Sequence, residues 1–164
     1  MGHLMSKFLF MTAIDLVGIA GYGKSVGGGA SELWAYEKFA EAVAHVESGK
    51  DYAAVGDGGK ARGAWQMHEA AWKDAQDYYA KSGTKIPSYR SWRKPEAQSY
   101  AFHGFVRSCR DRMIAAGVAN PDVRQMYLCF AMGFQAFKEI GFDPAKAPAA
   151  KVDAANRVLS IFQK

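Results

Sequence analysis

The sequence predicts a mainly α-helical domain with one short β-hairpin. Apolar residues recur at helical spacing in most of the chain after residue 33, and residues 51–67 interrupt this pattern with glycines and other turn formers. Apolar residues make up 49% of the 164 residues and charged residues 23%, which is the composition of a folded globular protein rather than a disordered one. The helical stretches are residues 33–48, 68–83, 95–117, 121–141 and 151–164.

The chain divides near residue 32 into an N-terminal segment, 1–32, and a domain, 33–164. The segment is apolar from Phe8 to Tyr22 and glycine-rich afterwards. A lysine before an apolar run, with small residues after it, is the plan of an export signal, although Asp15 interrupts the run. The run is also short for a membrane span. Weak membrane association through residues 8–22, or packing of the segment against a partner, are the alternatives.

Residues 18–25, GIAGYGKS, fit the pattern of a phosphate-binding loop. Such a loop needs a helix that opens at its lysine and, downstream, an acidic residue that ends a second apolar strand. Here Ser25 is followed by VGGGA, which opens a helix poorly, and the rest of the chain reads as helices. We therefore exclude a nucleotide-binding protein.

The net charge of +5 favours association with polyanions in general, including nucleic acid, anionic lipid and anionic cell-wall polymers. No basic run and no nucleic-acid-binding motif accompanies this charge, so we expect no nucleic-acid partner. Cys109 and Cys129 lie among apolar neighbours, which predicts buried thiols, with a single bridge between helices as the alternative in an exported protein. The four histidines show no ligand spacing, and we expect neither a metal nor a cofactor.

Glu47 has the most unusual position in the chain. It lies in the last turn of the helix 33–48, on the face that also carries Phe39 and Val43. Poor solvation and the negative end of the helix dipole both favour a protonated carboxyl, as a general acid requires. Asp57 follows in a Gly-Asp-Gly-Gly turn. If residues 51–67 fold back, two carboxylates flank one site, as in glycoside hydrolysis; simple turn formation is the equal alternative for Asp57.

The later helices are predicted from their ends. Pro95 suits a first helical turn, and Asn120 with Pro121 is expected to cap the helix 121–141. That helix is apolar nearly all round, so we expect it to be central. Gly133 within it allows close approach of a sugar or, equally, of a neighbouring helix.

The run HVESGKDYAAVGDGGKARGAWQM resembles the catalytic core of the lysozyme-like superfamily, and is most similar to soluble lytic transglycosylases and invertebrate-type lysozymes. The resemblance extends over residues 44–72. Three pieces carry it, in order: the E-S-G that ends the catalytic helix, the glycine-rich approach to a hairpin, and the motif G-[LP]-x-Q-[IMV]. In this chain they are Glu47-Ser48-Gly49, Gly56-Asp57-x-Gly59 and Gly63-Ala64-Trp65-Gln66-Met67.

The resemblance implies a small lysozyme-like domain, with the hairpin beside a cleft, that cleaves the β-1,4 bond between N-acetylmuramic acid and N-acetylglucosamine in peptidoglycan. Glu47 would protonate the glycosidic oxygen, and Ser48 would orient the carboxyl or the substrate. The remaining substrate-binding residues are expected to be Gly63, Trp65, Gln66 and Tyr127. Gln66 would hydrogen-bond a sugar hydroxyl or acetamido group, Trp65 would pack on a sugar face, and Tyr127 would reach the cleft. For Gln66 the alternative is a bond to the hairpin backbone, and for Trp65 and Tyr127 it is core packing.

Asp57 would decide the subtype. An aspartate near this position is the second catalytic carboxylate of invertebrate-type lysozymes, whereas lytic transglycosylases close an anhydro ring with the muramic 6-hydroxyl and need no second carboxylate. The A-Y-N segment of transglycosylases has its best counterpart here in residues 129–134, which lack asparagine. A non-catalytic glycan-binding or virion structural module is therefore the alternative function.

Stand-alone domains of this superfamily occur as phage lysins, virion-borne enzymes and secreted bacterial enzymes. We accordingly expect peptidoglycan strands as the partner, and a location in the periplasm or cell wall or on a virion. A further alternative is a basic helical domain that binds nucleic acid, although no sequence motif supports it. The oligomeric state is open.

Overall fold

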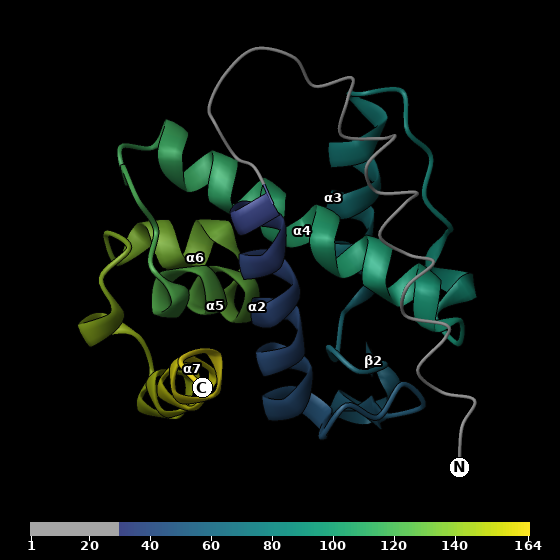
Figure 1. Cartoon of the computed structure of the whole chain (residues 1–164), viewed down its shortest axis with the longest axis horizontal. Coiled ribbons are helices and arrows are strands. Elements are labelled where there is room, and N and C mark those ends of the chain that lie inside the picture. The colour runs from purple at the N-terminus through teal and green to yellow at the C-terminus, as the bar shows by residue number, and fades with distance from the viewer. Residues whose placement is uncertain (1–29) are drawn as a thin grey trace.

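The computed structural model describes residues 30–164, and their side chains from Ala35 onward. This part of the chain contains six α-helices and one small antiparallel sheet (Figure 1), so the predicted mainly α class with a short hairpin is confirmed. The first helix begins at Ala30, three residues earlier than expected. The apolar run 8–22 and the phosphate-loop pattern at 18–25 lie outside the described residues, as does the N-terminal segment apart from its last three residues.

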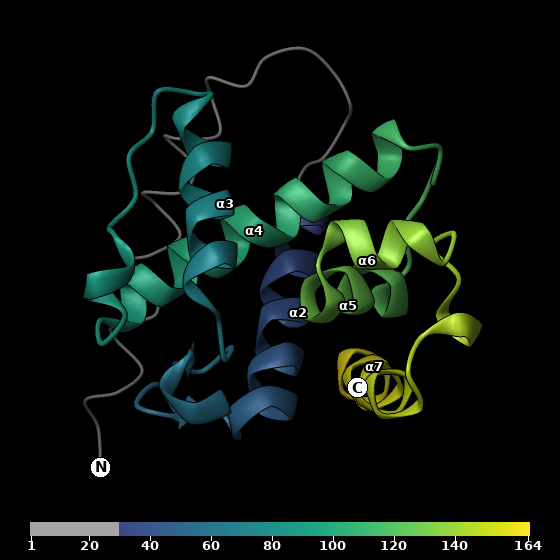
Figure 2. The same ribbon diagram turned by 180° about the vertical axis from the view of Figure 1, so that it is seen from behind.

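The helices are α2 (Ala30–Ser48), α3 (Glu69–Ala80), α4 (Pro95–Ala115), α5 (Val123–Met132), α6 (Phe134–Glu139) and α7 (Ala149–Phe162). The two strands, β1 (Val55–Gly56) and β2 (Ala61–Arg62), pair directly after α2. Figures 1 and 2 show α2 between two groups of elements: the hairpin lies at its C-terminal end on one side, and α5, α6 and α7 lie on the other. The long helix α4 contacts α3, α2, α5 and α6, and thereby connects the two groups.

An aromatic cluster around Phe102 of α4 joins these elements. The Phe102 ring is fully buried and stacks on Trp65 of the hairpin region, with ring centroids 4.9 Å apart. Phe39 of α2 and Phe130 of α5 contact the same ring at 6.2 and 5.3 Å. Aromatic pairs at these separations stabilise a core beyond simple area burial. The face of α2 that was predicted to be apolar is thus the face that packs on the core.

The predicted helix 121–141 is wrong in one respect, because the chain breaks at Gly133 into α5 and α6. Gly133 has φ of 81° and ψ of 151°, a conformation that residues with a Cβ rarely adopt. A Cβ built at Gly133 would meet no atom within 4 Å. The glycine is therefore required by the backbone turn, and close approach of a neighbouring helix, one of the two expected reasons for it, is wrong. Close approach of a sugar stays a prediction.

The start of α5 also differs from the prediction. Asp122, and not Asn120 or Pro121, is the N-cap residue. Its carboxylate accepts a hydrogen bond from the Gln125 N–H at 2.9 Å, and the Gln125 side chain accepts one from the Asp122 N–H at 3.1 Å. This reciprocal arrangement satisfies two backbone donors at once, which a capping asparagine at 120 would not do. Pro95 does occupy the first turn of α4, as predicted.

Cys109 of α4 and Cys129 of α5 are both buried and both free thiols, which confirms the prediction of buried thiols. A hydrogen bond with the Cys129 thiol, followed by burial, raises the pKa of Cys109 well above its usual value. Such a thiol stays protonated and is a poor nucleophile. The pair therefore acts as part of the apolar contact between α4 and α5.

Candidate active site

Glu47 and Tyr127 meet across the interface between α2 and α5. The Tyr127 hydroxyl donates a hydrogen bond to Glu47 Oε1 at 2.7 Å. Tyr127 is 2% exposed, whereas Glu47 is only half-buried. Burial, followed by the charge of Glu47, raises the pKa of Tyr127, so its hydroxyl keeps the proton that it donates. The buried Tyr127 hydroxyl thus fixes one carboxylate oxygen of Glu47, while the Glu47 side chain remains partly accessible to solvent.

Ser48 connects the end of α2 to the hairpin region. Its hydroxyl donates to the Ala64 carbonyl at 2.8 Å and accepts from the Asp51 N–H at 3.0 Å. Directly after it, Gly49 and Lys50 have φ of 66° and 69°, which ends the helix and turns the chain sharply. The Ser48 hydroxyl is thus bonded to the backbone that carries the G-x-x-Q segment, and its expected role in orienting the carboxyl or the substrate stays a prediction.

Asp57 lies in the turn between β1 and β2. Its backbone has φ of 46°, which aspartate tolerates better than most residues. Its side chain is 61% exposed, and Oδ2 lies 3.3 Å from Nε2 of His68, the residue before α3. The two carboxylates predicted to act together therefore have different partners: Tyr127 for Glu47 and His68 for Asp57.

Gln98 was missed by the sequence analysis, although it organises the hairpin region. This side chain of α4 is 2% exposed, and its amide makes three hydrogen bonds to backbone. It accepts from the Ala64 N–H at 2.8 Å and donates to the carbonyls of Tyr52 and Trp92 at 2.8 and 2.6 Å. A glutamine on the apolar stripe of a helix, three and four residues before Ala101 and Phe102, was the signal that could have found it.

Gly63 packs directly against this amide. A Cβ built at Gly63 would overlap the Gln98 side chain, and the residue has φ of 78°. Both observations require glycine at this position. Gly63 therefore has a structural role in the candidate site, because it lets the backbone pass directly over the buried amide of Gln98.

Gln66 occupies a strained position next to the hairpin. Its φ is 48°, and its Nε2 donates to the Gly63 carbonyl at 2.9 Å. Its Oε1 lies over Gly56 so closely that a Cβ there would overlap it. The bond to the hairpin backbone that we gave as the alternative is therefore present. Oε1 makes no hydrogen bond within residues 35–164, and Gln66 is only partly buried, so this oxygen is available to a ligand.

Trp65 does not form an exposed sugar platform. Its ring is 5% exposed, stacks on Phe102 and contacts the Tyr52 ring edge-on. Its indole N–H donates to the Ala40 carbonyl of α2 at 2.8 Å. The core-packing alternative therefore holds, and Trp65 fixes the G-x-x-Q segment against α2.

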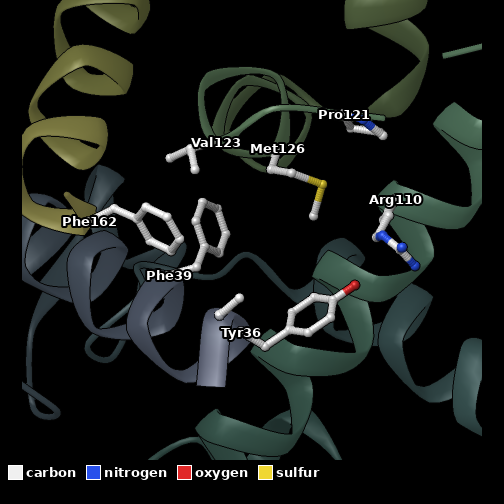
Figure 3. Close-up of a pocket in the computed structure, with 8 residues that line it drawn as sticks. Tyr36, Phe39, Arg110, Pro121, Val123, Met126 and Phe162 are labelled. Atoms are coloured by element: carbon white, nitrogen blue, oxygen red, sulfur yellow. The ribbon is translucent and has the colours of Figure 1, made fainter. Parts of the chain in front are cut away.

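A separate hollow lies at the other end of α2 (Figure 3). This cavity of about 210 Å³ is lined mainly by apolar side chains, among them Phe39, Met126 and Phe162, with Arg110 at its edge. Its closest residue on α2, Phe39, is eight residues from Glu47, or about 12 Å along the helix. None of the predicted site residues lines this cavity, so the hollow and the candidate site are distinct.

Within residues 35–164, no group of three or more His, Cys, Asp or Glu side chains is arranged to hold a metal ion. No helix in the described part of the chain is long and apolar enough to cross a membrane. Comparison of the chain with protein families, with curated proteins and with solved structures finds no match.

Proposed function

We propose that this protein is a lysozyme-like glycosidase that cleaves the β-1,4 bond between N-acetylmuramic acid and N-acetylglucosamine in peptidoglycan, with Glu47 as the general acid. The observation that carries the proposal is the bond from Tyr127 to Glu47 at the point where α2 meets the glycine-rich hairpin. The supporting sequence observation is the ordered set of Glu47-Ser48-Gly49, the hairpin glycines and the Gly63–Met67 motif.

The Glu47–Tyr127 bond gives the two carboxyl oxygens different roles. Because the Tyr127 hydroxyl donates to Oε1, that oxygen is an acceptor, and in the protonated acid the proton resides on Oε2. Oε2 is then the atom that delivers the proton to the glycosidic oxygen as the bond to the sugar breaks. Tyr127 is a positioning residue in this scheme, because it acts through Glu47.

Gln66 supplies a substrate contact in the same scheme. Its Nε2 is bonded to Gly63, so the free acceptor is Oε1. An amide oxygen accepts a hydrogen bond from a sugar hydroxyl or from the N–H of an acetamido group. The strained φ of 48° is consistent with a side chain held in place for binding.

The environment of Asp57 supports the route that needs only one catalytic carboxylate. Its side chain is exposed and paired with His68, and its backbone conformation is that of an Asp-Gly turn. In the one-carboxylate route the muramic 6-hydroxyl attacks the anomeric carbon, gives its proton to the carboxylate that Glu47 has become, and closes an anhydro ring. In hydrolysis water is the nucleophile and Asp57 assists it.

Mass spectrometry of the soluble products from purified peptidoglycan tests the proposal. Wild type should release muropeptides, and Glu47→Gln should reduce the rate by about 100-fold or more, since general acid catalysis contributes at least this much. Glu139→Gln, an exposed glutamate of α6, is the matched control and should retain the wild-type rate.

The ends of the products separate the two routes, with anhydromuramic ends for transglycosylation and reducing muramic ends for hydrolysis. Release of no product by wild type over a range of pH and salt would contradict the proposal. If the protein then still sediments with peptidoglycan, the non-catalytic glycan-binding module takes its place.

A further inference from the structure

Arg157 belongs to α7, the helix that contacts both helices of the Glu47–Tyr127 pair. It is next to Val158 and three residues after Ala154, both of which are buried in the core, while its own side chain is exposed. The helix α7 contacts α2, which carries Glu47, and α5, which carries Tyr127, and Figure 1 shows it alongside α2. The charge of Arg157 opposes the effect of burial on the pKa of Tyr127. The positive charge of this exposed side chain therefore acts on Tyr127 from the solvent side.

Arg157 has no partner of its own within residues 35–164. No aspartate or glutamate in this part of the chain forms an ion pair with it, and no aromatic ring lies beneath its guanidinium. Other arginines of the described chain differ in this respect, because they lie over rings of Tyr36, Tyr89, Trp92 or Phe134; these are Arg62, Arg93, Arg107 and Arg112. Arg157 thus presents its hydrogen-bond donors to solvent, on a helix that packs against α2 and α5.

We propose that Arg157 binds a carboxylate of the substrate next to the bond that is cleaved, and thereby selects acidic glycan strands. The inference rests on the proposed function. The planar guanidinium offers paired N–H donors that match the two oxygens of a carboxylate. A muramic residue carries a carboxylate on its lactyl group or, when a peptide stem is joined to that group through an amide bond, on the stem, whereas a strand made only of N-acetylglucosamine carries none. A carboxylate held at Arg157 positions the muramic sugar, and not its neighbour, beside Glu47.

Steady-state kinetics on two matched substrates test this assignment. One substrate is a soluble glycan strand with free stem carboxylates, and the other is the same strand after its carboxylates have been converted to amides. Arg157→Gln should raise KM for the free-carboxylate strand by about tenfold, the size expected for one charge-assisted hydrogen-bonding partner. It should leave kcat unchanged, and should leave KM for the amidated strand unchanged as well.

Two further variants serve as controls. Lys151→Gln removes an exposed cation from the same helix, six residues before Arg157, and should have no effect on either substrate. Arg157→Lys keeps the charge and loses the paired donors, so it should raise KM by less than Arg157→Gln does. If Arg157→Gln changes both substrates equally, or lowers kcat alone, the residue acts on the Glu47–Tyr127 pair and the proposed contact is wrong.

A binding measurement separates this inference from the proposed function. Calorimetric titration of the Glu47→Gln protein with the two strands requires no cleavage. The Glu47→Gln protein should bind the free-carboxylate strand more tightly than the amidated strand, and the double variant that also carries Arg157→Gln should lose this preference. That result supports the inference even if wild type releases no product. Equal binding of both strands overturns the inference even if wild type is an active glycosidase.

Discussion

The two walls beside Glu47 are built in different ways. The hairpin wall, residues 49–67, contains three of the four non-glycine residues with positive φ in the described chain, and its strands are only two residues long. The helical wall, formed by α5 and α7, consists of regular helix packed through buried apolar side chains such as Leu128 and Val158. It reaches the candidate acid through the side chain of Tyr127 and, in our proposal, reaches the substrate through the side chain of Arg157.

This difference shows that the two walls depend on different forces. An irregular backbone leaves some of its hydrogen-bonding groups without a backbone partner, so the hairpin wall needs polar side chains from elsewhere. Gln98 of α4 and Ser48 of α2 provide them, both at Ala64. The helical wall satisfies its backbone internally and is stabilised by apolar burial. Loss of a polar group should therefore harm the first wall far more than the second.

The largest effect on stability is expected for Gln98→Leu. The leucine has a similar volume but leaves the Ala64 N–H and the carbonyls of Tyr52 and Trp92 without their partners. At 1–3 kcal/mol for each buried unsatisfied group, we expect the free energy of unfolding to fall by about 4 kcal/mol. Urea denaturation followed by circular dichroism measures this change.

Gln135→Leu is the control for this prediction. Gln135 is an exposed glutamine of α6, and its replacement should change the free energy of unfolding by about 0.5 kcal/mol or less. Similar losses for the two variants would mean that the hairpin wall does not depend on the buried amide, and the contrast between the walls would not hold.

Gly63→Ala should have the next largest effect. Gly63 and Gly83 have nearly the same φ, 78° and 77°, but only at Gly63 would a Cβ overlap another side chain, that of Gln98. Gly83→Ala should cost about 1 kcal/mol from backbone strain alone. Gly63→Ala adds the displacement of a buried amide and should cost about 3 kcal/mol. The difference between the two thermal midpoints measures the contact with Gln98, and equal midpoints would contradict it.

Most of the fold could be predicted from the sequence because each helix is marked by local chemistry. The apolar stripe through Phe39 and Val43, and Pro95 at the start of α4, were sufficient to locate α2 and α4. The break at Gly133 was missed, because a glycine that turns the chain and a glycine that lets helices approach look alike in a sequence. The cap at Asp122 was missed because Asn120 and Pro121 offer equally plausible local signals.

The candidate site was indicated mainly by residues that are close in sequence, and Tyr127 was the one distant residue expected at the cleft. Glu47, Gly63 and Gln66 belong to one short run, so their spacing indicated a site. The hydrogen bonds of Gln98 to Ala64, 34 residues away, and of Tyr127 to Glu47, 80 residues away, depend on tertiary packing. The burial of Trp65 was also not predictable, since a tryptophan suits a sugar platform and an aromatic core equally well.

Tyr127→Phe should separate activity from stability on the helical wall. The ring keeps its core contacts, so the free energy of unfolding should fall by only about 1 kcal/mol for one lost hydrogen bond. Glu47 loses its only bond to the helical wall, and we expect kcat on peptidoglycan to fall by about tenfold, within the range of a misplaced acid. An unchanged kcat would remove Tyr127 from its positioning role and leave it as a packing residue.

Asp57→Asn is expected to have the smallest effect, and it tests whether the hairpin wall contributes chemistry as well as shape. Asparagine tolerates the same positive φ, so the turn should be kept. The exposed pair with His68 contributes at most about 0.5 kcal/mol. If Asp57 only forms the turn, the rate on peptidoglycan should stay within about twofold and the product ends should not change. A loss of about 100-fold, with reducing ends among the wild-type products, would instead make Asp57 the second carboxylate. The hairpin wall would then supply a reacting group to the site, and the helical wall only the residues that hold the acid and its substrate.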